Sequence, residues 1–297
     1  MSTPRTRHWR REKALPYLLL APALVLLVGM IYPFGLGLYY SFTSYWLQYP
    51  NRFRFVWLDN YVDLMEEPLF ARALEFTLGF TLVAVVVQVG LGLAVALLLH
   101  GRIPGRSVIR ALMLLPLMMP PVITALMWKI MMASTNAGIL NYMLSFLGID
   151  PVNWFGSTQG AVVSVLIIDT WGNLPFVALI LLGGLQALPT EPYEAALIDG
   201  ANQWQMFWNI TYPLVLPFLV VALIMRTIDA LKVFETIWAI CNGGPGTASE
   251  VLNVYLYAQA FAYNQVGTAS AVVVVFFAII VALSLVLLWA RQKAKWS

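Results

Sequence analysis

The sequence predicts an all-α polytopic membrane protein with six transmembrane helices and both termini on the cytoplasmic side. Three observations lead to this prediction. Of the 297 residues, 61% are hydrophobic and 10% are charged, whereas a soluble domain carries about 25% charged residues. Several apolar runs exceed the ~18 residues that mark a membrane-spanning helix. The basic residues stand in short clusters beside these runs, which is typical of a membrane surface and not of a nucleic-acid partner.

The apolar runs define the expected spans. They cover residues 15–38, 74–99, 111–133, 160–186, 212–240 and 266–290. We expect helices, because lipid offers backbone groups no partners, and prolines inside the runs predict kinks. The basic N-terminus resembles a signal peptide, but its apolar run exceeds the ~7–15 residues of a signal-peptide core and no small-residue cleavage site closes it. We therefore expect a basic cytoplasmic tail over 1–14, a transmembrane domain over 15–290 and a cytoplasmic tail over 291–297.

Lys and Arg in the flanks of the runs predict the orientation. Eleven of the 17 basic residues lie in the N-terminal tail, in the loop after the second run and at the C-terminus. They are Arg5, Arg7, Arg10, Arg11, Lys13, Arg102, Arg106, Arg110, Arg291, Lys293 and Lys295. An even number of spans places all three clusters on one side, which is then cytoplasmic. Segment 187–211 falls on the same side, yet it is acidic and has no basic residue.

Segment 187–211 predicts two short helices separated by Gly200, which supplies the stop or reversal. Thr190 is placed to cap the first helix, and residues 202–209 make a second helix rich in Trp and Phe. A loop helix resting on anionic lipid would carry Lys and Arg. Because this one carries none, we favour a docking helix that enters a groove on another protein.

The residues of this loop form a recognisable order. Glu194-Ala195-Ala196 is followed by Asp199-Gly200-Ala201, then by Ile210 and Pro213, with Tyr212 in place of the usual Leu. This order resembles the EAA motif of ABC importer permeases. The resemblance implies the ABC type I importer fold, in which this loop sits in a cleft of the ATP-hydrolysing subunit. It therefore makes Glu194, Ala195, Ala196, Asp199, Gly200 and Ala201 the candidates for ATPase coupling.

A second stretch narrows the resemblance. Phe234-Glu235-Thr236-Ile237, then Gly243-Gly244-Pro245, then an aromatic run from Tyr255 to Phe261 resemble the carbohydrate (maltose-like) branch, with Glu235 where that branch has Asp. The resemblance implies a sugar or sugar-like cargo and a multi-pass location in a prokaryotic plasma (inner) membrane. It also implies three kinds of partner: a second permease subunit in a heterodimer, two ATPase subunits and an extracytoplasmic solute-binding protein.

The chain lacks the signature of an ATPase. A phosphate-binding loop needs a Gly-Lys pair, and no such pair occurs in the sequence. We therefore expect a non-catalytic subunit with no cofactor of its own, and ATP and Mg on the partner subunit. His8 and His100 stand alone, so the sequence predicts no metal site.

Ionisable residues inside apolar runs suggest function. Arg226, Asp229, Lys232 and Glu235 follow each other at three-residue intervals in the fifth run, where neighbours can pair along a helix face. Asp169 stands in the fourth run, close to an aromatic ring and an amide. The candidates for the substrate pathway are Asp169, Trp171, Asn173, Arg226, Asp229 and Lys232. Two other interpretations stay open, a self-neutralised stripe in the fifth run and interhelical hydrogen bonds by Asp169.

Two other functions compete with the importer permease. An ion-driven secondary transporter acting alone would use the fifth-run charges as a relay, but such transporters often show two related halves and none is visible here. A scaffold subunit without a pore would have little use for a polar fifth span.

Overall fold

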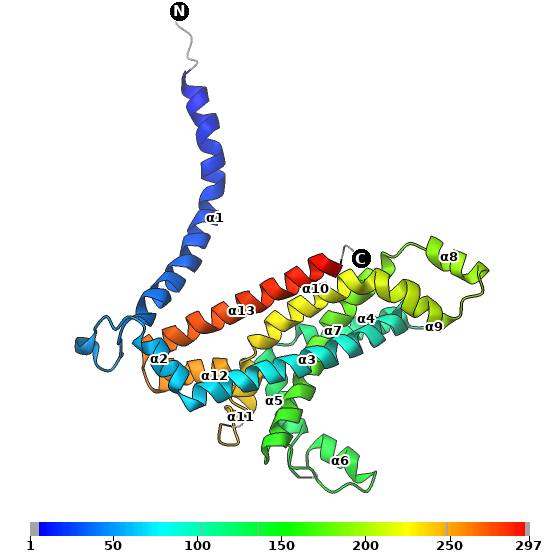
Figure 1. Cartoon of the computed structure of the whole chain (residues 1–297). Helices are drawn as coiled ribbons and strands as arrows, with labels where there is room; N and C mark the ends of the chain where they lie inside the picture. Colours follow the sequence, from blue (N-terminus) through cyan, green and yellow to red (C-terminus); the bar gives the residue numbers. More distant parts are fainter. Residues whose placement is uncertain (1–5, 102, 136, 248, 295–297) are drawn as a thin grey trace, which may run out of the picture. The chain divides into compact units, whose positions relative to one another are not determined.

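The computed structural model of the chain describes residues 6–101, 103–135, 137–247 and 249–294 and is built of helices (Figure 1). The longer helices are α1 (Thr6–Ser41), α3 (Pro68–His100), α4 (Arg106–Met118), α5 (Pro121–Met131), α7 (Thr158–Gln186), α10 (Tyr212–Leu231) and α13 (Val266–Ala294). The shorter ones are η1 (Pro50–Arg52), α2 (Asp59–Glu66), α6 (Ile139–Ser145), α8 (Glu191–Ile198), α9 (Gln203–Met206), η2 (Phe207–Thr211), α11 (Glu235–Cys241), α12 (Leu252–Tyr257) and η3 (Ala258–Ala262).

Five stretches of the described residues are long and apolar enough to cross a membrane. They are Leu19–Ser41, Pro68–His100, Thr158–Gln186, Gln203–Leu231 and Val266–Ala290. They match five of the six predicted spans. A sixth span exists only if α4 and α5 are counted together, since they meet at an angle of 101°.

The prediction of one kinked helix over 111–133 is wrong, because the chain breaks into α4 and α5. Met119 is extended at the break (φ −82°, ψ 134°). Pro120 and Pro121 follow it, and proline both lacks the N–H of the helical ladder and pushes the preceding residue out of the helical region. Two successive prolines therefore end one helix and start another.

The predicted fifth span over 212–240 is also wrong at both ends. It starts earlier, because a π-helical turn, η2, joins α9 to α10 without a break at Pro213. It ends earlier, because α10 stops at Leu231 and α11 begins at Glu235. The break frees the carbonyl of Val233, which accepts a hydrogen bond from Asn253 Nδ2 at 3.4 Å. A contact with a distant residue thus compensates the lost helical bond.

The chain forms two compact units, one of residues up to Glu66 with Ala258–Val275, the other of Glu67–Tyr257 with residues from Phe276 onward. In the first unit Asn60 Nδ2 donates to the carbonyls of Ser41 and Thr43 at 2.8 and 2.9 Å. Gly267 packs so closely there that a Cβ would lie 2.1 Å from the Thr43 carbonyl oxygen. These contacts hold the end of α1 to α2 and to the start of α13.

The second unit is organised around α3 and α7, which run parallel. Gln88 lies beside Asp169, and Gly92 faces Val177 so closely that a Cβ would approach Val177 Cγ1 to 2.6 Å. Helix α10 runs the opposite way, because Arg226 meets Asp169 while Phe218 meets Gly184. The loops that follow α3 and α7 therefore leave from one end of this unit, as the predicted topology requires.

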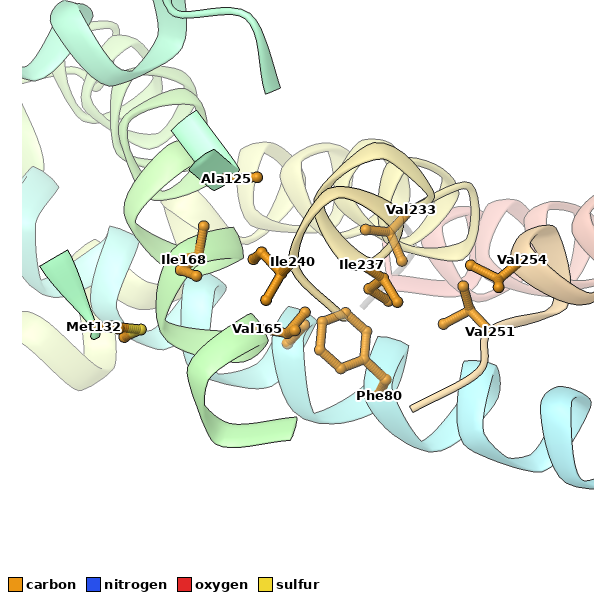
Figure 2. Close-up of a cluster of buried hydrophobic side chains, with 11 residues drawn as sticks. Phe80, Ala125, Met132, Val165, Ile168, Val233, Ile237, Ile240, Val251 and Val254 are labelled. Atoms are coloured by element: carbon orange, nitrogen blue, oxygen red, sulfur yellow. The ribbon is translucent and has the colours of Figure 1, made fainter. Parts of the chain in front are cut away.

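Two apolar clusters fill the second unit. The first comprises Phe80, Ala84, Ala125, Met132, Val165, Ile168, Val233, Ile237, Ile240, Val251 and Val254 (Figure 2). The second comprises Val85, Val89, Ala96, Leu99, Val177, Leu181, Leu182, Leu185, Val215, Ala222 and Ala230. Along α3 and α7 the two clusters meet near Gln88 and Asp169, and on α10 Arg226 lies between Ala222 and Ala230 of the second cluster. Apolar packing on both sides therefore removes this polar level from solvent.

Glu250 predicts a pH dependence of stability. It lies outside the membrane-spanning helices, in the loop before α12, and burial raises its pKa above the ordinary value of 4.5. Protonation of Glu250 therefore stabilises the folded protein. This contribution to the free energy of unfolding is complete below pH 4.5 and is lost as the pH rises through the raised pKa. We expect Glu250→Gln to melt above the unmodified protein at pH 7 and level with it at pH 4, in thermal scans of the purified protein. Equal melting temperatures at pH 7 would contradict this effect of burial.

Candidate coupling helix and substrate pocket

Helix α8 begins without the side-chain cap that the sequence predicts. Thr190 is the residue before the helix, but its hydroxyl makes no capping bond and its backbone is helical (φ −86°, ψ −25°), whereas a capping Thr needs an extended backbone. The Thr190 carbonyl instead accepts from the N–H groups of Tyr193 and Glu194 at 3.0 and 3.1 Å. Glu191 and Glu194 in the first turn complement the helix dipole.

Gly200 ends α8 in the left-handed conformation, with φ +74°, which confirms the predicted stop. Ala201 N then donates to the Ala196 carbonyl at 2.9 Å, closing the helix end. Asn202 restarts the chain with a capping box: its side chain accepts from Gln205 N, and the Gln205 side chain accepts from Asn202 N, both at 2.9 Å. A backbone bond therefore fixes the first end of the reversal, and two bonds between side chains and backbone fix the second.

The tip of α8 presents apolar side chains to the outside. Leu197 is 60% exposed and Ile198 is 87% exposed, beside the exposed Glu194, Ala195 and Asp199. Figure 1 shows α8 beyond the ends of α7 and α10. Leaving such side chains in water forgoes about 1.5–3 kcal/mol each. Because the segment has no Lys or Arg for lipid headgroups, this surface suits burial against a protein.

Tyr193 ties α8 to the start of α10, a contact that sequence reasoning missed. Its hydroxyl donates to Thr211 Oγ1 at 3.1 Å, and Thr211 Oγ1 in turn donates to the Met206 carbonyl at 3.4 Å. No spacing rule connects a tyrosine and a threonine that lie 18 residues apart. This short chain of bonds links α8 to η2, which continues directly into α10.

Tyr193→Phe is expected to lower the free energy of unfolding by about 1 kcal/mol. The substitution removes one partly buried hydrogen bond and keeps the ring. Denaturant unfolding of the purified protein would measure the effect. Thr211→Val should cost less in the Tyr193→Phe background than alone, because the shared bond is already lost and only the bond to the Met206 carbonyl remains to be removed. Fully additive effects would show that the two side chains act separately.

A buried polar network joins α3, α7 and α10. Arg226 is 1% exposed and forms an ion pair with Asp169, which is 6% exposed. Arg226 Nε donates to Gln88 Oε1, and Gln88 Nε2 donates to Asp169 Oδ2 at 2.8 Å. Asn173 Nδ2 donates to Asp169 Oδ1 at 3.0 Å. The carboxylate is thus held by three donors, as a buried charge requires.

A pocket of about 260 Å³ opens beside this network. Asp169 and Asn173 line it, together with Thr124 of α5 and Thr236 of α11. The broken α4–α5 segment supplies most of the apolar wall, namely Pro116, Leu117, Met119 and Pro121. The same pair of prolines that prevents a straight span therefore shapes this pocket.

The predicted pathway residues lie in three separate arrangements. Asp169, Asn173 and Arg226 come together in the network. Trp171 contacts Trp128 edge to face at 5.7 Å between ring centroids. Asp229 pairs with Lys232 at 3.3 Å, with side chains 50% and 54% exposed. The interpretation of Arg226 as part of a self-neutralised stripe is wrong, since its partner is on α7. Gln88 was missed, although an amide in a long apolar helix is a usable signal.

The comparisons with known proteins identify the family. Residues 88–294 match the family described as the binding-protein-dependent transport system inner membrane component. This chain belongs to that family. It is 39% identical over 283 residues to the trehalose/maltose transport system permease protein MalF of Thermococcus litoralis, covering 94% of each chain. It is 33% identical over 268 residues to the multiple sugar-binding transport system permease protein MsmF of Streptococcus mutans, covering 88% of this chain and 89% of the other.

The permease also matches solved structures. A bacterial alginate ABC transporter, solved in complex with an alginate pentasaccharide-bound periplasmic protein, contains a chain with a TM-score of 0.83 and 24% identity. The match covers 96% of this permease and 97% of that chain. The predicted ABC importer permease fold and the multi-pass membrane location are confirmed.

Proposed function

We propose that this permease forms half of the translocation pore of an ATP-driven importer for a sugar or sugar-like solute. It pairs with a second permease subunit in a heterodimer, with two ATPase subunits that hold ATP and Mg, and with an extracytoplasmic solute-binding protein. The names of the sugar permeases that it resembles support the cargo class. The observation that carries the proposal is the exposed, lysine-free and arginine-free tip of α8, which needs a protein partner.

The contacts of α8 support a coupling route. Residues Glu194 to Ala201 enter a groove of the ATPase on the cytoplasmic side, the side set by the Lys and Arg clusters. When the ATPase pair closes, α8 moves with it. The bond between Tyr193 and Thr211 transmits the displacement to α10, whose far half carries Arg226. Because Arg226 is paired with Asp169 beside the pocket, a rigid-body shift of α10 changes the shape of that pocket.

The pocket is the proposed contact with cargo. The Asp169 carboxylate and the Asn173 amide oxygen offer acceptors to sugar hydroxyls, and Thr124 and Thr236 offer hydroxyl groups, which both donate and accept, on the facing helices. Thr124 and Thr236 had no signal in the sequence, since a threonine inside an apolar helix commonly bonds to its own backbone.

Reconstitution in proteoliposomes tests the proposal. We expect uptake only when this permease, its partner permease, the ATPase pair, external binding protein and internal ATP are all present. Vesicles with this chain alone and a proton or sodium gradient, without ATP, test the alternative of a secondary transporter. Gradient-driven uptake by the chain alone would replace the importer proposal, and ATP-dependent uptake without gradient would support it.

A further inference from the structure

We propose that the pocket beside Asp169 selects cargo without net charge, namely neutral polyhydroxyl ligands, against sugar phosphates and sugar acids. Arg226 acts from behind the wall as a positioning residue that neutralises Asp169. The inference rests on the proposed function in taking this pocket as the contact with cargo.

The two charges beside the pocket cancel. Asp169 lines the pocket, whereas Arg226 is 1% exposed and is not among the described residues that line it. The Asp169 carboxylate accepts from Arg226 and Gln88 at Oδ2 and from Asn173 at Oδ1. Its negative charge is therefore matched by one positive charge on the far side of the wall. The wall presents acceptor oxygens but no net charge.

The remaining wall is polar and uncharged. Thr124 and Thr236 contribute hydroxyl groups. Gly172 contributes bare backbone, and a Cβ there would meet no atom within 4 Å, so this backbone borders open space. The other charged residues of the helices that line the pocket are not among its described lining residues. Arg106 of α4, Lys129 of α5 and Glu235 of α11 are exposed, and Arg110 of α4 is partly exposed and donates to the Leu99 carbonyl at 3.2 Å.

An anionic cargo would lose its hydration here without gaining a cation. Burying an ionised group without a partner is strongly unfavourable. Arg226, the cation paired with the pocket residue Asp169, is already engaged by Asp169 and Gln88. A neutral sugar faces no such penalty, because each hydroxyl both donates and accepts and can match the threonines, the amide and the carboxylate. The arrangement thus favours neutral cargo by electrostatics before any shape is considered.

Charge-matched thiol labelling measures the potential in the pocket. In the full importer with Cys241→Ser, which removes the single cysteine, Thr124→Cys places a thiol in the wall. Its labelling rates with anionic sulfonatoethyl and cationic trimethylammonioethyl methanethiosulfonate are divided by those of free mercaptoethanol. We expect the two normalised rates to agree within about threefold. Adding Asp169→Asn should favour the anionic reagent by at least about tenfold, since Arg226 is then uncompensated. Adding Arg226→Gln as well should restore agreement.

In the Thr124→Cys protein with Asp169 and Arg226 intact, a large preference for either charged reagent would overturn the proposal. This outcome does not depend on whether the Asp169→Asn variant folds. Equal rates in a folded Asp169→Asn variant would also overturn the proposal.

Protection of the same thiol by ligands tests the cargo class. Methyl glucoside carries a hydroxymethyl group where methyl glucuronide carries a carboxylate, so the two ligands form a pair that differs in charge. Slower labelling by the neutral hydroxyethyl reagent with the glucoside alone supports the proposal, and equal or greater protection by the glucuronide overturns it. If neither ligand protects the thiol while ATP-driven uptake persists, the pocket is not the contact with cargo. The charge-selection proposal then fails, but the importer function stands. Loss of ATP-driven uptake in the unmodified complex would instead refute the proposed function. Gly172→Leu, which fills the pocket, should remove any protection.

Discussion

Arg226→Met is expected to lower the free energy of unfolding by about 3–5 kcal/mol, the largest effect of any single substitution predicted here. The substitution leaves the Asp169 carboxylate buried without its cation, and Gln88 without the donor that it accepts from. Breaking a buried ion pair by removing one partner has this magnitude, because the remaining charge has lost its hydration and gained nothing. Unfolding by denaturant in detergent micelles, followed by circular dichroism, would measure the change.

The chain offers a matched control in its second ion pair. Lys232→Met breaks the contact with Asp229. Both side chains of this pair are about half exposed, so its loss should lower the free energy of unfolding by only about 0–1 kcal/mol. The double variant Asp169→Leu with Arg226→Met should recover much of the loss, since a well-packed apolar pair replaces a buried ionic pair at little cost. Similar losses for Arg226→Met and Lys232→Met would contradict the burial argument.

The sequence identified the charged residues, but it predicted the partners only of those that pair along one helix. Spacing along one helix shows which residues share a face, so Asp229 and Lys232 were found as neighbours. Arg226 pairs instead with a residue 57 positions earlier, and its helix is fixed against α7 by apolar packing that no local pattern encodes. The same limit applies to Gln88, whose partners belong to α7 and α10.

Helix ends show the same division between local and distant causes. Gly200 could be predicted, because a left-handed stop depends on the backbone of that residue alone. Pro120 and Pro121 predicted only a kink, and neither the break nor its 101° angle was predicted, since the direction of the second helix depends on what α5 packs against. The end of α10 at Leu231 was not predicted, and the bond from Asn253 that compensates the freed Val233 carbonyl joins residues 20 positions apart, which no local pattern encodes.

Gly200→Val is expected to reduce ATP-driven uptake by at least about tenfold while the protein still inserts into the membrane. Gly200 has φ +74°, and a β-branched residue there costs on the order of 1–3 kcal/mol in backbone strain. The strain is relieved by changing the turn, which redirects α8 relative to Tyr193 and η2. ATP hydrolysis in the reconstituted importer should then continue without matching uptake, because the ATPase moves a helix that is no longer aligned with α10.

Two variants separate coupling from strain. Gly200→Asn should keep most of the uptake, since asparagine tolerates the left-handed conformation.

Gly105 has φ +75°, nearly the same backbone conformation as Gly200, and a Cβ there would likewise meet no atom within 4 Å. It lies in the loop after α3, at the same end of the second unit but outside the α8 loop. Gly105→Val thus imposes a similar strain on a loop without the docking surface. We expect it to leave uptake within about threefold of normal, because backbone strain outside the α8 loop does not redirect α8. Equal losses from both valine variants would assign the defect to backbone strain at this end of the protein, and normal uptake with Gly200→Val would remove α8 from the coupling route. A loss confined to Gly200→Val and absent from Gly200→Asn is the result that only a precisely directed docking helix explains.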